Sequence, residues 1–131
     1  MDRNKIYDTV VDMLEQAIGI ERSLCKPEAS LQGELGIESI DLLDIQFRLE
    51  RTFKIEIIRD ELFPDDIFAD KCVSTENGLV TEHGLNELKI AIPFVNWERV
   101  TLPLKVSDIQ NVYTVDSLVN FVESKLTQMA T

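Results

Sequence analysis

The sequence is poor in the residues that usually build catalytic and metal-binding sites. Its 131 residues include one histidine and two cysteines, Cys25 and Cys72, which lack the close spacing of a metal-binding motif. The five glycines form neither a phosphate-binding loop nor a Gly-x-Ser-x-Gly turn. A small enzyme with its own nucleophile and base is therefore the weakest interpretation, and we expect a non-catalytic protein without a metal.

Long apolar stretches are also missing. No run approaches the roughly 20 apolar residues that cross a bilayer. The first residues, Met1 to Lys5, lead into an amphipathic segment rather than the apolar core of a signal peptide. Two isolated cysteines fit free thiols in a reducing compartment better than a disulfide. We therefore expect a cytoplasmic protein without stable membrane insertion.

Positive charge is scarce. The chain has 13 lysines and arginines against 24 aspartates and glutamates, a formal net charge of −11. Nucleic acid is excluded as a partner because its phosphates would be repelled, whereas a basic protein would be attracted. With 44% hydrophobic residues the chain can form the core of one small domain, which we expect to be a monomer.

Helical spacing of apolar residues predicts a mainly α fold. The first helix runs from about Asn4 to Ile18 and ends at Gly19. The second runs from about Ser39 to Thr52 or Phe53. A short helix is expected near residues 106–111, and Thr114 caps the last helix.

The segment from about Ile58 to Lys105 has folding signals of its own. Asn77-Gly78 predicts a short β-hairpin. Thr81 predicts the N-cap of an extra helix, which Pro93 would end. The carboxylates of this segment lack a calcium-loop pattern, so a solvated surface is favoured over a metal site for Asp60, Glu61, Asp65 and Asp66. The aromatic residues are expected to anchor the segment on the rest of the protein: Phe63, Phe68, Phe94 and Trp97.

A loop before the second helix ends in a distinctive motif, Leu35-Gly36-Ile37-Glu38-Ser39-Ile40-Asp41. This motif, followed by an amphipathic helix, resembles the prosthetic-group site of acyl carrier proteins. The resemblance covers roughly residues 4–57 and 105–128. It implies a single domain, residues 1–131, with an acyl-carrier-like four-helix bundle formed by residues 1–59 and 105–131. Residues 60–104 would be an insert before the third helix that contains the hairpin and the extra helix.

The resemblance implies that Ser39 bears covalent 4'-phosphopantetheine, whose thiol holds acyl groups as thioesters. A serine at a helix start is more often a cap, but Glu38 is better placed to cap this helix. The chain offers no base for Ser39, so the resemblance implies a separate phosphopantetheinyl transferase using coenzyme A and magnesium. The family usually has aspartate where this chain has Glu38.

Two further features have open alternatives: the carboxylates of the second helix and the apolar positions of the core. Carboxylates recur every three residues along one face of this helix: Glu38, Asp41 and Asp44. They form either a solvated face or, by resemblance, a recognition surface. Its partners would be the transferase and acyl-processing enzymes such as ketosynthases or acyltransferases. The apolar positions predicted to pack in the core could also part to admit an acyl chain, as in the family: Leu43, Phe47, Ile57, Ile109, Leu118 and Val119.

The expected function is therefore that of an acyl carrier protein in fatty acid, lipid or polyketide-type biosynthesis, in which the insert adjusts the choice of partner or acyl chain. The alternative is a carrier-like interaction module that has no prosthetic group and binds a partner through its acidic helix.

Overall fold

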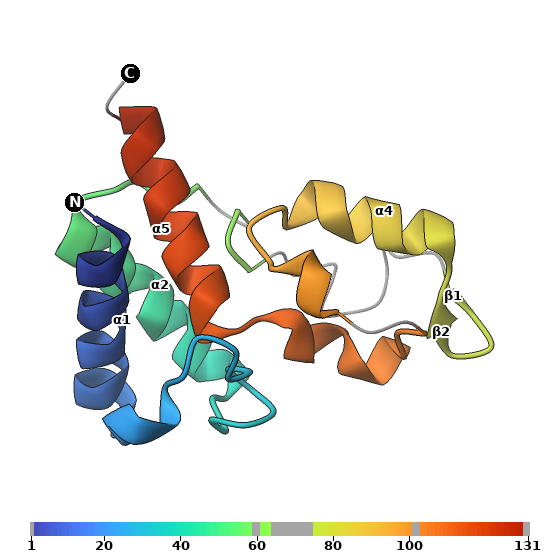
Figure 1. Ribbon diagram of the computed structural model, residues 1–131, viewed down its shortest axis with the longest axis horizontal. Coiled ribbons are helices and arrows are strands. Elements are labelled where there is room, and N and C mark those ends of the chain that lie inside the picture. Colours follow the sequence, from blue (N-terminus) through green and yellow to red (C-terminus); the bar gives the residue numbers. More distant parts are fainter. Residues whose placement is uncertain (1, 59–60, 64–74, 101–102, 130–131) are drawn as a thin grey trace.

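The computed structural model (Figure 1) describes residues 2–58, 61–63, 75–100 and 103–129. The bundle has three long helices, α1 (Arg3–Ile18), α2 (Ser39–Phe53) and α5 (Val115–Met129), and one short helix described below. Helix α1 lies against both α2 and α5, and its residues Ile6, Val10 and Leu14 are fully buried between them. The predicted mainly α fold is confirmed.

The helix ends follow from local side-chain and backbone chemistry. The Asp2 carboxylate accepts a hydrogen bond from the Lys5 backbone N–H at 2.9 Å and so caps α1. Gly19 ends α1 in the left-handed conformation, at φ 76°, as the sequence predicts. At the start of α5, the backbone N–H of Thr114 donates to the Ser117 hydroxyl and that of Ser117 donates to the Thr114 hydroxyl.

The third helix of the bundle is a 3-10 helix, η3 (Val106–Val112), directly before α5. The long loop after α1 contains the short helix η1 (Arg22–Leu24) and then runs beside the junction of η3 and α5. There the Leu31 N–H donates to the Tyr113 carbonyl at 2.9 Å, and the Val115 N–H donates to the Ala29 carbonyl at 3.1 Å. The loop is therefore fixed to the bundle.

The segment between α2 and η3 contains the predicted hairpin and extra helix. Strands β1 (Thr75–Glu76) and β2 (Leu79–Val80) pair in antiparallel fashion, and Asn77 and Gly78 between them have positive φ. Helix α4 (Glu82–Ala91) begins where the Thr81 hydroxyl accepts from the Gly84 N–H at 3.0 Å. A single turn, η2 (Trp97–Arg99), follows, and Figure 1 shows α4 and the hairpin to one side of the bundle.

This segment shares the apolar core of the bundle. Leu62, Leu88 and Ile92 are fully buried in the same cluster as the bundle residues. Tyr113 lies between the rings of Phe63 and Phe94, with centroids 5.2 and 6.0 Å away. Anchoring by Phe63 and Phe94 is thus confirmed. The division of the chain at residues 59/60 and 104/105 stays a prediction.

The structure describes two more of the residues predicted for this segment, Trp97 and Glu61. Trp97 is half-buried and donates from its ring N–H to the Ile92 carbonyl at 3.2 Å. Glu61 pairs with Lys125 of α5 at 2.6 Å. Four of the predicted residues lie outside the described part of the chain: Asp60, Asp65, Asp66 and Phe68.

Within the described residues, no helix is long and apolar enough to span a membrane.

Candidate functional site

The start of α2 is capped by the residues on either side of Ser39. Glu38 is the N-cap residue, and it forms a capping box with Asp41. In this box the Asp41 carboxylate accepts a hydrogen bond from the Glu38 backbone N–H at 3.1 Å. The prediction that Glu38 caps the helix is confirmed. The helix start is therefore capped by the two neighbours of Ser39.

The loop that leads to Ser39 is held by its backbone. Gly36 has a positive φ of 67°, which favours glycine over residues with a side chain. The next residue, Ile37, is buried, and its N–H donates to the Leu31 carbonyl at 2.9 Å. The turn at Gly36 and the anchor at Ile37 together fix the position of Ser39 as the first residue of α2.

The chemistry of this helix start fits a covalently attached phosphodiester. The first N–H groups of a helix lack partners within the helix, and its N-terminus carries partial positive charge, so an anion is favoured there. The carboxylates of Glu38 and Asp41 oppose an anion. Glu38 is exposed and Asp41 half-exposed, so solvent weakens this repulsion.

The predicted acidic stripe has roles within α2 itself. Asp41 belongs to the capping box, and Asp44 forms an ion pair with Arg48 one turn later at 3.1 Å. Both members of that pair are more than 40% exposed, so it contributes little to stability. Recognition of a partner by Glu38, Asp41 and Asp44 stays a prediction.

The prediction of core packing is right for four of the six apolar positions and wrong for two. The four buried residues are Ile57, Ile109, Leu118 and Val119. Leu43 and Phe47 are instead 70% and 57% exposed.

The cause is the width of the apolar face of α2. It has two neighbouring lines of apolar residues, and only one can face the core. The line of Leu42, Ile45 and Leu49 is buried, so the other line is exposed to solvent. Leu43 and Phe47 therefore line no enclosed core cavity in this structure, and an acyl-chain role for the four buried residues stays a prediction.

The exposed line forms a surface that sequence reasoning missed. We call it the apolar stripe of α2, and it consists of Ile40, Leu43 and Phe47. Ile40 is 73% exposed, and the Arg51 guanidinium lies over the Phe47 ring at 5.5 Å from its centroid. The stripe begins directly after Ser39 and runs beside the carboxylates of Asp41 and Asp44. The sequence did contain a signal for this surface: α2 has more apolar residues than one buried face needs.

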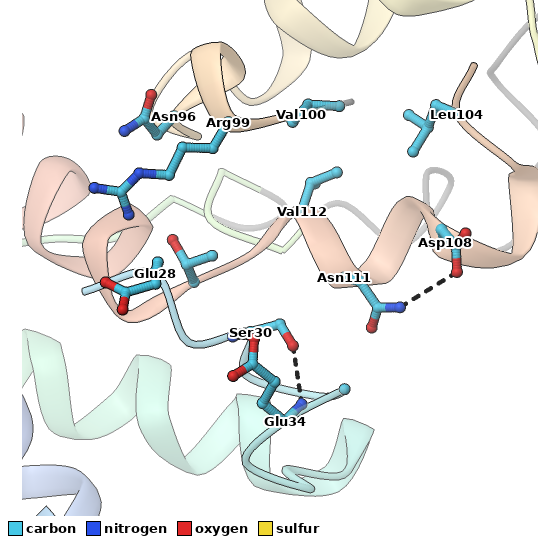
Figure 2. A pocket seen from close by; sticks show the side chains of 12 residues that line it. Glu28, Ser30, Glu34, Asn96, Arg99, Val100, Leu104, Asp108, Asn111 and Val112 are labelled. Carbon is cyan, nitrogen blue, oxygen red and sulfur yellow. Dashed lines mark hydrogen bonds between the residues drawn. The ribbon is translucent and has the colours of Figure 1, made fainter. Parts of the chain in front are cut away.

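The second feature that sequence reasoning missed is a pocket of about 560 Å³ (Figure 2). One wall is the loop around Ser30 and Glu34, another is the end of the inserted segment around Arg99, and the third is η3 with Asn111. These three walls are distant in the sequence, so no local pattern could have predicted the pocket.

The lining of the pocket is mixed in character. Polar groups are carried by Ser30, Asn111 and Thr114, while Val100 and Val112 are apolar. The Ser30 hydroxyl accepts from the Glu34 N–H at 2.9 Å, and the Asn111 amide donates to the Asp108 carboxylate at 3.4 Å (Figure 2).

Gly33 allows the loop to approach η3 closely. A Cβ atom at position 33 would lie 2.7 Å from the Ser30 hydroxyl oxygen and 2.8 Å from Oδ1 of Asn111. This is closer than a carbon can approach either atom without displacing it.

Other reactive side chains lie away from the start of α2 along the chain. Cys25 is a free thiol, and its burial raises the pKa of that thiol. Cys72 lies outside the described part of the chain. His83 is exposed on α4 and pairs with Glu87 at 3.6 Å. Within the described residues, no group of histidine, cysteine and carboxylate side chains could hold a metal ion.

Comparison with known proteins gives a family match at this site. Residues 8–73 match the family model described as the phosphopantetheine attachment site. The chain is 33% identical over 88 residues to the acyl carrier protein AcpXL of Rhizobium meliloti, covering 65% of this chain and 90% of the relative. It is 31% identical over 85 residues to an acyl carrier protein of Rubrobacter xylanophilus, covering 63% and 96%. A third relative, an acyl carrier protein of Syntrophus aciditrophicus, is 38% identical over 58 residues, covering 44% and 68%.

Proposed function

Because the chain belongs to the acyl carrier protein family, whose prosthetic group is covalent 4'-phosphopantetheine, we propose that Ser39 is the residue that bears it. The observation that carries this proposal is the position of Ser39. It is the first residue of α2, inside the matched region, and the helix is capped by its neighbours. The bound group supplies a terminal thiol, which holds an acyl chain as a thioester.

The protein acts as a non-catalytic carrier, and its own residues position the attachment site. Ile37 anchors the loop, and Glu38 and Asp41 start the helix. None of these side chains is a base of the histidine type that could activate a serine hydroxyl. A separate phosphopantetheinyl transferase therefore supplies the base, together with coenzyme A and magnesium.

The partner surface combines charge with apolar contact. Glu38, Asp41 and Asp44 attract a basic patch. The apolar stripe of α2 supplies area whose burial favours association. Its three side chains are more than half exposed, and exposed apolar groups that cluster on one face are a common mark of interaction sites. The partners are the transferase and acyl-processing enzymes such as ketosynthases or acyltransferases, acting in the cytoplasm in fatty acid, lipid or polyketide-type biosynthesis.

Intact-mass measurement after coexpression with a phosphopantetheinyl transferase tests the proposal. We expect the mass to increase by one phosphopantetheine group, and the increase to vanish in Ser39→Ala. The matched control is Ser23→Ala, at an exposed position in the loop, which should gain the full mass. An unchanged mass of the wild-type protein would favour the alternative, an interaction module without a prosthetic group. A gain retained in Ser39→Ala would place the group elsewhere.

A further inference from the structure

We propose that the pocket in Figure 2 holds the distal part of the prosthetic arm together with an uncharged acyl group, so that the inserted segment shields the thioester. This inference rests on the proposed attachment at Ser39. The inference goes beyond that attachment in two ways. It assigns a resting site that the inserted segment helps to build, and it assigns a class of cargo.

The pocket lies within reach of an arm attached to Ser39. Its loop wall includes Gly33 and Glu34, and Glu34 is five residues before Ser39 in the sequence. Five residues span at most roughly 17 Å when fully extended. The loop is folded back between the two, because the Ile37 N–H donates to the Leu31 carbonyl at 2.9 Å and so holds residue 37 beside the loop wall at Ser30. An extended phosphopantetheine arm matches such a span.

The polar groups of the pocket match the chemistry of the arm. Pantetheine contains two amides separated by short aliphatic links, and amides need both donors and acceptors. Side-chain amides from Asn96 and Asn111 and the hydroxyl of Thr114 provide both. Val100 and Val112 provide apolar surface for the aliphatic links. The volume, about 560 Å³, lies within the range of roughly 300–1,000 Å³ that is typical of small-molecule sites.

The charge of the pocket selects against anionic cargo. Its rim carries the carboxylates of Glu28, Glu34 and Asp108. Among the described residues that line it, Arg99 is the one cation, and its guanidinium already pairs with Asp116 at 3.2 Å. An acyl group that ends in a carboxylate would meet net repulsion, whereas an uncharged acyl group would not.

The inserted segment forms one wall of this pocket. Asn96, Arg99, Val100 and Leu104 come from that segment and face the loop and η3 across the pocket. Without these residues the loop and η3 would border open solvent on this side. The insert would therefore select cargo through the pocket.

Paramagnetic NMR measures where the arm rests. The transferase loads Ser39 from coenzyme A that carries a nitroxide on its sulfur, so neither cysteine of the chain is labelled. We expect the amide signals of Gly33, Arg99 and Asn111 to broaden more than those of Leu43 and Phe47, which follow Ser39 on the exposed line of α2. Equal broadening of the two sets, with the label attached, would overturn the pocket assignment and leave the attachment at Ser39 intact.

Two variants make the comparison specific. Asn111→Leu removes an amide from the pocket, and we expect broadening at Gly33 and Arg99 to fall at least twofold. The matched control is Asn86→Leu, at an exposed position of α4 away from the pocket lining, which should leave the broadening unchanged. Amide spectra of both variants show whether the fold is retained. An Asn111→Leu protein that is folded but broadens like the wild type would contradict the proposal.

The cargo class is tested by loading from acetyl- and succinyl-coenzyme A. Relative to the apo protein, we expect the acetyl form to shift the amides of Arg99 and Asn111, and the succinyl form to shift them less than half as much. In Glu34→Gln the two forms should become more alike, because one repelling carboxylate is gone. Equal shifts from both forms in the wild-type protein would overturn the assignment of an uncharged cargo.

Discussion

At the scale of single residues, substitutions of Asp41 and Asp44 can separate helix capping from the recognition of partners. Asp41 caps the helix through the Glu38 N–H, whereas Asp44 only pairs with Arg48 on the surface. We expect Asp41→Ala to lower the free energy of unfolding by about 1 kcal/mol, the usual cost of a lost cap. Asp44→Ala should cost less than about 0.5 kcal/mol. Urea denaturation of both variants measures this difference.

If both carboxylates also recognise partners, both variants should lose transferase kcat/KM severalfold although only Asp41→Ala is less stable. Unchanged kcat/KM in Asp44→Ala would contradict the recognition role of that residue. The exposed Glu82→Ala on α4 serves as a control for the loss of one negative charge far along the chain.

Tyr113 links the bundle to the inserted segment through one buried hydrogen bond. Its hydroxyl donates to the Leu62 carbonyl at 2.7 Å, and burial raises its pKa above the ordinary value of 10.0. Above pH 10 the tyrosine of the unfolded chain loses its proton while that of the folded chain keeps it. Stability is therefore fully present below pH 10 and falls as the pH rises, by at most about 1.4 kcal/mol per pH unit for this group.

The variant Tyr113→Phe tests this dependence. At neutral pH we expect it to lose about 1–3 kcal/mol, because the Leu62 carbonyl stays buried without this donor. Between pH 10 and 11 its stability should fall less steeply than that of the wild type. Tyr7, whose pKa burial also raises, is present in both proteins and cancels in the comparison. Parallel slopes in urea denaturation would contradict this account.

At the scale of the element, α2 uses its two apolar lines for different purposes. Ile45 is fully buried, and Ile45→Ala should cost about 2–5 kcal/mol in unfolding free energy. Phe47→Ala and Leu43→Ala change exposed positions and should cost less than about 0.5 kcal/mol, apart from the lost contact of Phe47 with Arg51. The same two variants should weaken transfer to a ketosynthase severalfold. Loss of stability without loss of transfer would show that the apolar stripe serves the fold instead.

The bounds of α2 were predictable because their causes are local. Glu38, Asp41 and the helical spacing lie in one short stretch, and the structure begins the helix at Ser39 as expected. The hairpin at Asn77-Gly78 and the cap at Thr81 were predictable for the same reason.

Which line of α2 faces the core was not predictable, because it depends on where α1 lies. Leu42 and Leu43 are equally apolar, and only the packed bundle distinguishes them. The pocket was hidden for a related reason: Glu34, Arg99 and Asn111 have no relation in the sequence and meet only when the loop, the insert and η3 pack together.

At the scale of the whole molecule, the inserted segment and the bundle are joined by buried contacts of several kinds. Besides the Tyr113 hydrogen bond, the Asp116 carboxylate of α5 pairs with Arg3 at 3.1 Å and with Arg99 at 3.2 Å. Asp116 is buried, so its two arginines connect α1, α5 and the insert at one point. Leu88 and Ile92 add apolar burial to the same core. We therefore expect the two parts to unfold together.

The single tryptophan makes this cooperativity measurable. Trp97 lies in the inserted segment, whereas most of the helical circular dichroism comes from α1, α2 and α5. Both signals should change at the same urea concentration, because a two-state protein loses all its structure in one step. In Asp116→Asn, which keeps the side-chain volume and removes the charge, both midpoints should fall together, by an amount equal to about 1–3 kcal/mol. A tryptophan transition at a lower urea concentration than the helical transition would show that the insert unfolds first. The pocket that the insert lines would then be lost before the helical bundle unfolds.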